Sequence, residues 1–179
     1  TAAMVMELLH GLPLSTMLRP DDGRARMQLS VEQTARVLLP VIDALAAAHA
    51  AGVVHRDLKP ENVFLVGERP LEHPHVKVLD FGIAKLTATE GDVMSSGQLT
   101  RSGFVLGTPH YMSPEQVSGD SAIDTRTDIW SLGVILFQLI AGRAPYVGSA
   151  AGIGAAIVND PPPPLRSLRG DAPEELDDV

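Results

Sequence analysis

A short stretch of the sequence, HRDLKPENVF at residues 55–64, brings two carboxylates, an imidazole, a guanidinium, an ammonium and an amide together within eight residues. Another carboxylate, Asp80, follows at the end of a later β-rich run. Hard Mg²⁺ takes oxygen ligands, and Asn62 with Asp80 would leave positions on the metal open for substrate phosphates. Asp57 would then be available to accept a proton, while Lys59 would meet the oxygens of a transferring phosphoryl group. These residue types suit phosphoryl transfer in the presence of Mg²⁺.

Each of these side chains also has a simpler explanation when it is taken alone. Asp and Asn commonly cap helices and turns, and an Asp-Phe-Gly such as that at residues 80–82 also arises by chance. Support for a shared site must therefore come from the surrounding elements and from further motifs.

The composition describes one ordinary globular core. The chain has 179 residues, of which 45% are hydrophobic and 20% charged, which is enough for one domain or part of one. Its formal net charge of -8 offers no basic field for a nucleic acid or an anionic membrane, so we expect no nucleic-acid partner. The sequence contains no cysteine, which excludes disulfides and thiolate metal sites and is consistent with a reducing cytosol.

Two long helices are expected to carry the fold. The first begins at a capping box formed by Ser30 and Gln33, and its apolar residues repeat at three and four positions up to Gly52. The second covers residues 127–141 and ends at Gly142. Polar residues interrupt both apolar tracts and caps stand beside them, so both are predicted to be buried helices and not membrane spans.

The β-structure is expected to be small. Residues 4–9 form one short apolar run, which Gly11 and Pro13 are predicted to break. Two further β-rich runs, at residues 63–66 and 75–79, are joined by a turn-rich segment and predict a hairpin. Together with the two helices, these runs predict a mainly helical α+β protein.

Four motifs stand in one order along the chain: HRDLKPEN, DFGIAK, GTPHYMSPEQ and DIWSLGVILFQLIAG. The second and third enclose a long loop rich in Gly, Ser and Thr, and a loop of that length in a compact domain is usually functional or disordered. In these motifs the sequence resembles the eukaryotic-like protein kinase family, specifically the bacterial serine/threonine kinases, over nearly its whole length. Chance agreement of four ordered motifs is negligible.

The resemblance implies an α+β, protein-kinase-like fold, mainly the α-helical large lobe with a short β-hairpin. Residues 1–11 then correspond to the end of the small lobe and the hinge, and residues 12–179 to the large lobe. We expect residues 1–179 to be a partial kinase domain, without the N-terminal lobe and truncated at the C-terminus. The family's Gly-rich loop, strand lysine and helix glutamate precede the hinge, so we expect this chain by itself to be inactive.

The resemblance also assigns roles around the catalytic loop. Asp57 corresponds to the catalytic base, Lys59 to the phosphate-facing lysine, and Asn62 and Asp80 to the Mg²⁺ ligands that also hold the ATP phosphates. Thr108 corresponds to the threonine that joins Asp57 and Lys59 and lines the floor for the substrate hydroxyl, although a turn threonine is the alternative. A lysine two residues after the catalytic aspartate favours serine or threonine as the acceptor.

Several supporting residues follow from the same resemblance. His55 and Phe81 correspond to packed supports of the loop, and Asp128 to a buried aspartate that holds the catalytic-loop backbone. Ser113 stands where the family usually has alanine, a mild departure before the Pro-Glu anchor of the substrate loop.

The adenine side of the site is less well marked. The resemblance implies that backbone groups of Glu7 and Leu9 bind the adenine base, with Met6 as the gatekeeper. Phe64 would lie under the adenine, where the family more often has a smaller aliphatic residue.

The loop before Thr108 is expected to carry a regulatory switch. Arg56 corresponds to the family's receptor for a phosphate on this loop, and Thr100 and Ser102 match the positions that carry it in related bacterial kinases. A phosphate adds about -1.5 to -2 charges, enough to order a loop against an arginine. An unmodified, solvent-exposed hydroxyl is the alternative at either position.

The sequence therefore predicts a cytoplasmic serine/threonine protein kinase that uses ATP and Mg²⁺ to phosphorylate proteins in bacterial signalling. A membrane anchor outside this chain and a homodimer for autophosphorylation are both compatible with it. Two alternatives stay open: a pseudokinase or scaffold with the same fold, and a small-molecule phosphotransferase. The presence of Asp57, Asn62 and Asp80 argues against the first, and the Thr108 loop with its Pro-Glu anchor against the second.

Overall fold

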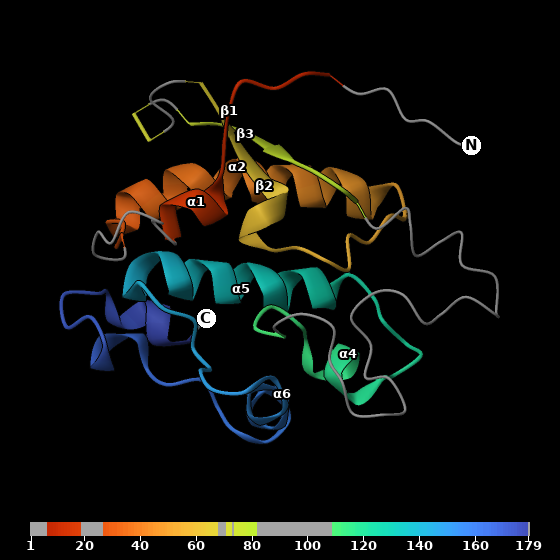
Figure 1. Cartoon of the computed structure of the whole chain (residues 1–179), viewed down its shortest axis with the longest axis vertical. Coiled ribbons are helices and arrows are strands. Elements are labelled where there is room, and N and C mark those ends of the chain that lie inside the picture. Colours follow the sequence, from red (N-terminus) through yellow and green to blue (C-terminus); the bar gives the residue numbers. More distant parts are fainter. Residues whose placement is uncertain (1–6, 19–26, 68–70, 73, 82–108, 179) are drawn as a thin grey trace.

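The computed structural model describes residues 7–18, 27–67, 71–72, 74–81 and 109–178. A small sheet lies on one long helix, that helix packs on a second, and short helices lie beyond it (Figure 1). This arrangement confirms the predicted, mainly helical α+β architecture. In chain order the elements are β1 (Gly11–Pro13), α1 (Leu14–Leu18), α2 (Val31–Ala50), η1 (Pro60–Asn62), β2 (Val63–Val66), β3 (His75–Val78), α4 (Pro114–Ser118), α5 (Arg126–Ala141), α6 (Ala150–Asn159), η2 (Leu165–Ser167) and η3 (Glu174–Asp178), where η denotes a 3₁₀ turn.

Helix α2 begins as the sequence predicts. The hydroxyl of Ser30 accepts a hydrogen bond from the backbone N–H of Gln33 at 3.1 Å. The side chain of Gln33 in turn accepts the backbone N–H of Ser30 at 3.0 Å, so the capping box is complete. One face of the helix is buried, and its members are Thr34, Val37, Leu38, Val41 and Leu45.

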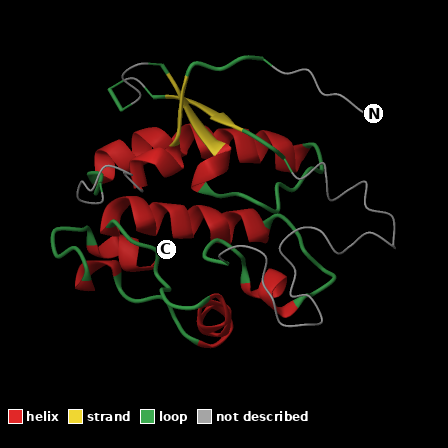
Figure 2. Cartoon of the chain, in the orientation of Figure 1, coloured by secondary structure: helices red, strands yellow, loops and turns green. Residues whose placement is uncertain are grey.

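Helices α2 and α5 lie side by side and form the centre of the molecule (Figures 1 and 2). Val37 and Val41 of α2 share a core cluster with Ile135 and Leu139 of α5, all of them 1% exposed or less. Residues of α5 also pack against the C-terminal 3₁₀ turns, so this helix is buried on several sides. Within the part of the chain that the structure describes, no helix combines the length and apolar character needed to cross a membrane.

The C-terminal end of α5 is bound by side chains from two distant segments. Gln28 donates a hydrogen bond from Nε2 to the carbonyl of Ala141 at 3.1 Å. Arg169 donates from Nη1 to the carbonyl of Ile140 at 3.2 Å and also to the carbonyl of Leu29. The last carbonyls of a helix have no partner within the helix, and these contacts satisfy two of them.

The three strands form an antiparallel sheet in the order β1-β2-β3. Val63 and Leu65 of β2 are fully buried in the cluster that α2 helps to form, whereas Phe64 between them is half-buried. The side chain of Phe64 therefore lies on the opposite face of the sheet, because successive strand residues alternate between faces. The predicted hairpin of residues 63–66 and 75–79 is confirmed, with the second strand ending at Val78.

The first strand differs from the sequence prediction. Of the predicted strand at residues 4–9, positions 4–6 lie outside the described residues, and positions 7–9 belong to no helix or strand. Gly11 and Pro13, which were predicted to break a strand, instead form β1 and pair with Val66 and Phe64. Strand β1 lies at the edge of the sheet, where a proline's missing N–H is tolerated, so the breaker rule fails here.

Gly11 is required by a close approach between two backbones. Its φ is +154°, and a Cβ atom at this position would lie 2.0 Å from the carbonyl oxygen of Leu65. Gly67 also has a positive φ, of +104°, but a Cβ atom there would meet nothing within 4 Å. An alanine at Gly67 would have only an unfavourable φ, whereas an alanine at Gly11 would also clash with the backbone of Leu65.

We expect Gly11→Ala to separate β1 from β2, because backbone atoms cannot move aside as a side chain can. The loss should be about 2 kcal/mol or more in the free energy of opening of the β2 amides, measured by hydrogen exchange. Gly67→Ala is the control and should cost only about 1 kcal/mol, the price of a positive φ. Equal losses in the two variants would contradict the proposed close approach.

Candidate active site

The polar stretch at residues 55–62 connects the end of α2 to strand β2 and runs beside the first turn of α5 (Figure 1). It has no helix or strand of its own apart from the turn η1. Its shape must therefore come from contacts with neighbouring elements, and a few buried side chains supply them.

Asp128, in the first turn of α5, holds the backbone of this loop. Its side chain is fully buried, and its two carboxylate oxygens accept the backbone N–H groups of His55 at 2.9 Å and Arg56 at 2.8 Å. His49 of α2 donates from Nε2 to the same carboxylate at 2.7 Å. The positive end of the helix dipole also favours a negative charge in this turn. The predicted contact between Asp128 and the loop backbone is confirmed.

His55 joins the loop to the segment that follows β3. The backbone N–H of Asp57 donates to Nδ1 of His55 at 3.3 Å, so Nδ1 is the acceptor and Nε2 carries the proton. Nε2 then donates to the carbonyl of Leu79 at 2.9 Å. The imidazole is fully buried and its centroid lies 4.8 Å from that of the Phe81 ring. His55 and Phe81 thus pack together, as predicted.

Asp57 and Lys59 form an ion pair at the surface of the loop. Nζ of Lys59 donates to Oδ2 of Asp57 at 2.8 Å, with 36% and 49% of the two side chains exposed. An ion pair that is this exposed contributes about 1 kcal/mol or less to folding. Both charged groups are accessible to a molecule that approaches from solvent.

Asn62 lies beneath this pair and is 7% exposed. Its Nδ2 donates to the backbone carbonyl of Asp57 at 2.9 Å, so the amide oxygen is the atom left to bind a cation. The backbone carbonyl of Asn62 accepts the N–H of Leu79 at 2.8 Å, which brings the next residue, Asp80, close to the loop. The side chain of Asp80 is exposed. An amide oxygen and a carboxylate are a donor set that suits Mg²⁺ and leaves room for phosphate oxygens.

The backbone is strained at two positions of this site. Among the described residues, Arg56 with φ +64° and Asp80 with φ +54° are the only non-glycine residues with a positive φ. Such conformations cost roughly 1 kcal/mol or more each and persist where the surroundings enforce them. Arg56 directly precedes Asp57, the predicted base, and Asp80 is itself a predicted Mg²⁺ ligand.

Two of the residues predicted to bind adenine, Phe64 and Glu7, are connected to one face of the sheet through Lys77. Phe64 and Lys77 are directly paired across β2 and β3, so their side chains share a face. Nζ of Lys77 forms an ion pair with the carboxylate of Glu7, which ties the segment before β1 to this face. Leu9 lies in that segment and is half-buried.

Other predicted residues are not placed. Met6, Thr100, Ser102 and Thr108 lie outside the described residues. The structure thus brings together Asp57, Lys59 and Asn62 on one loop, with Asp80 beside them, and the assigned roles stay predictions.

Sequence reasoning missed two residues that contact the site. Sequence reasoning assigned no contact to His49, although a histidine in an alanine-rich stretch is a signal for a polar contact. Gln116 donates from Nε2 to the backbone carbonyl of Arg56 at 2.7 Å. Its only sequence signal is a capping-box spacing with Ser113, which does not point to the loop.

The chain is similar to several curated bacterial proteins. Serine/threonine-protein kinase pkn3 of Myxococcus xanthus is 48% identical over 166 residues, which are 91% of this chain and 28% of that protein. Serine/threonine-protein kinase Pkn1 of the same organism is 45% identical over 163 residues, 90% of this chain and 21% of that protein. Serine/threonine-protein kinase PknA of Mycobacterium tuberculosis is 37% identical over 169 residues, 92% of this chain and 34% of that protein.

The chain therefore spans between about a fifth and a third of the length of these relatives. A family model described as "Protein kinase domain" matches residues 1–160, which is most of the chain. This match agrees with the loop geometry around Asp57 and Asn62 and with the fold built on α2 and α5. The chain belongs to the protein kinase domain family.

Proposed function

We propose that the protein that contains this chain is a serine/threonine protein kinase of bacterial signalling, which transfers the γ-phosphoryl group of ATP to hydroxyls of proteins. The observation that carries the proposal is the loop on which Asp57, Lys59 and Asn62 lie together, fixed from beneath by the buried carboxylate of Asp128. The names of the three relatives support the same activity and the choice of serine or threonine.

In this reaction the oxygen of the acceptor hydroxyl attacks the γ-phosphorus. The bond from that phosphorus to the bridging oxygen breaks, and ADP leaves with the bonding electrons. Asp57 accepts the proton of the hydroxyl, and its half-exposed carboxylate is open to an incoming protein side chain. Lys59 would offer positive charge to the phosphoryl oxygens, and its hydrogen bond of 2.8 Å to Oδ2 of Asp57 supports this role beside the base.

Asn62 and Asp80 would hold Mg²⁺, which would neutralise charge on the ATP phosphates. The hydrogen bond from Asn62 to the carbonyl of Asp57 keeps the amide oxygen in one orientation.

Backbone groups of Glu7 and Leu9 would bind the adenine, and Phe64 would pack beneath it. Thr108 would line the floor for the acceptor hydroxyl. The kinase domain would act in the cytoplasm, and this proposal is compatible with a membrane anchor outside this chain and with a homodimer for autophosphorylation.

The first test concerns the base and the metal ligand. In the full-length protein, Asp57→Asn should lower turnover by about 10²-fold or more, the usual contribution of general-base catalysis. Asp80→Ala should abolish transfer, because a Mg²⁺ ligand is lost. Transfer of radiolabelled phosphate from ATP to a generic Ser/Thr substrate measures both. Glu61→Gln, an exposed carboxylate in the same loop, is the matched control and should retain activity. Turnover near that of the unmodified protein in either site variant would refute the assignment.

A second test concerns His49 of α2, which contacts the carboxylate of Asp128 that holds the loop carrying Asp57. His49→Leu should lower turnover by about tenfold, because the buried carboxylate of Asp128 loses a hydrogen-bond donor. Asp128 would then hold the backbone of His55 and Arg56 less firmly, and Asp57 would be less well positioned. His49→Gln should restore most of the activity, because a glutamine amide can donate from a similar position. Steady-state kinetics at a fixed temperature, together with hydrogen exchange of residues 55–57, would measure the effect. Equal activity of the two variants would show that the hydrogen bond is unimportant.

A third test concerns activation. Among the described residues, Nε of Arg56 is buried and has no hydrogen-bond partner, which suits a residue that receives a phosphate. Mass spectrometry of the active protein should therefore find phosphate on Thr100 or Ser102. Replacing both with alanine should lower turnover, whereas the same change at Ser95 and Ser96 of that loop should not. If neither residue is modified and the double variant works normally, this switch is absent.

A further inference from the structure

Gln116, in the first turn of α4, makes contacts in two directions. Its Oε1 accepts the backbone N–H of Ser113 at 3.0 Å, which closes the capping box of this helix. Its Nε2 donates to the backbone carbonyl of Arg56 at 2.7 Å, across a separation of 60 residues in the sequence. One side chain thus caps α4 and contacts the catalytic loop.

The second contact falls on the strained residue of that loop. The N–H of Arg56 is held by Asp128 at 2.8 Å and its carbonyl by Gln116 at 2.7 Å, on the two sides of a residue with φ +64°. A strained conformation of this kind persists only where the surroundings determine it more than once. The carbonyl that Gln116 holds belongs to the peptide bond that leads into Asp57. The orientation of this peptide determines the direction in which the side chain of Asp57 leaves the backbone.

Helix α4 is itself fixed to α5 beside this point. The hydroxyl of Ser113 lies 2.6 Å from that of Thr127, and both residues are fully buried. Thr127 precedes Asp128, so the contacts form a closed ring: Ser113 to Gln116 to Arg56 to Asp128, and back through Thr127. If α4 moves, the side chain of Gln116 moves with it and shifts the carbonyl of Arg56.

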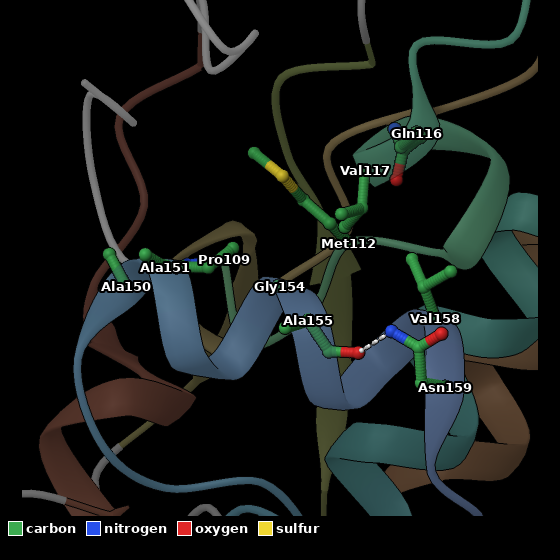
Figure 3. Close-up of a pocket in the computed structure, with 10 residues that line it drawn as sticks. All are labelled: Pro109, Met112, Gln116, Val117, Ala150, Ala151, Gly154, Ala155, Val158 and Asn159. Carbon is green, nitrogen blue, oxygen red and sulfur yellow. Dashed lines mark hydrogen bonds between the residues drawn. The ribbon is translucent and has the colours of Figure 1, made fainter. Parts of the chain in front are cut away.

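Helix α4 also borders a groove. Figure 3 shows Met112, Gln116 and Val117 on one side of it, with Gly154, Ala155 and Val158 of α6 opposite. Gln116 therefore stands between this groove and the catalytic loop. The contact between Gln116 and Arg56 lies on the loop side, and Arg56 does not line the groove.

We propose that Gln116 is a positioning residue, which sets the orientation of Asp57 through the carbonyl of Arg56 and so couples the placement of α4 to catalysis. This inference rests on the proposed kinase activity. The amide nitrogen carries the effect, because the amide oxygen is already used by the cap of α4. A carboxylate in place of the amide would keep that cap and set a negative oxygen against the carbonyl of Arg56.

The chain provides a matched pair of variants for the test. Gln116→Glu removes the donor to Arg56 and keeps an acceptor for Ser113. Gln33→Glu makes the same change in the capping box of α2, where Gln33 caps Ser30 in the same way. In the full-length protein we expect Gln116→Glu to lower kcat by about tenfold or more, since small displacements of a reacting group are costly. The KM for ATP should stay within about twofold, because the loss is of positioning and not of binding. Gln33→Glu should match the unmodified protein.

Hydrogen exchange separates failure of this inference from failure of the proposed function. Exchange of the amides at residues 55–62 should become faster in Gln116→Glu, while exchange in the middle of α2 stays unchanged. This measurement needs no substrate, so it tests the contact even if the unmodified protein transfers no phosphate and the proposed kinase function fails. An unchanged kcat in an active protein, a change confined to KM, or unchanged exchange of the loop would each overturn the inference.

Discussion

The burial of one carboxylate, that of Asp128, determines how the rest of the site is arranged. A buried charge is stable only where donors surround it, and here they come from the side chain of His49 and the backbone of His55 and Arg56. Three separate parts of the chain must therefore meet at one point. Leaving such a charge without its partners costs about 3 to 5 kcal/mol, so contact between these three parts is a condition of folding.

The sequence predicts elements well where the signal is local. Ser30 and Gln33 mark the start of α2 within four residues, and Gly142 marks the end of α5 by adopting the left-handed conformation that helix ends favour. Strand β1 was mispredicted because Gly11 and Pro13 are breakers in most settings. The partner that makes them acceptable, strand β2, lies some fifty residues away along the chain, and no local pattern records it.

The candidate site shows the same division. Asp57 and Asn62 are five residues apart, so their proximity can be predicted from the motif alone. Asp80 joins them only because Leu79 bonds to Asn62 and His55, which is a property of the folded chain. Gln33 and Gln116 occupy equivalent places in two capping boxes. Both follow a Ser-x-Glu-Gln pattern, which does not show that only Gln116 contacts the loop; the tertiary structure shows it.

The order in which the ribosome makes the chain gives the anchoring of the loop a further consequence. Arg56 is synthesised 72 residues before Asp128, and the side chain that closes the end of α5, Arg169, follows Ile140 by another 29. Contacts between such distant residues form late, because the intervening chain must be ordered before they can stabilise it. The loop that carries Asp57 and Asn62 is therefore synthesised well before the carboxylate that holds it, and it can take its final shape only after the first turn of α5 has been made.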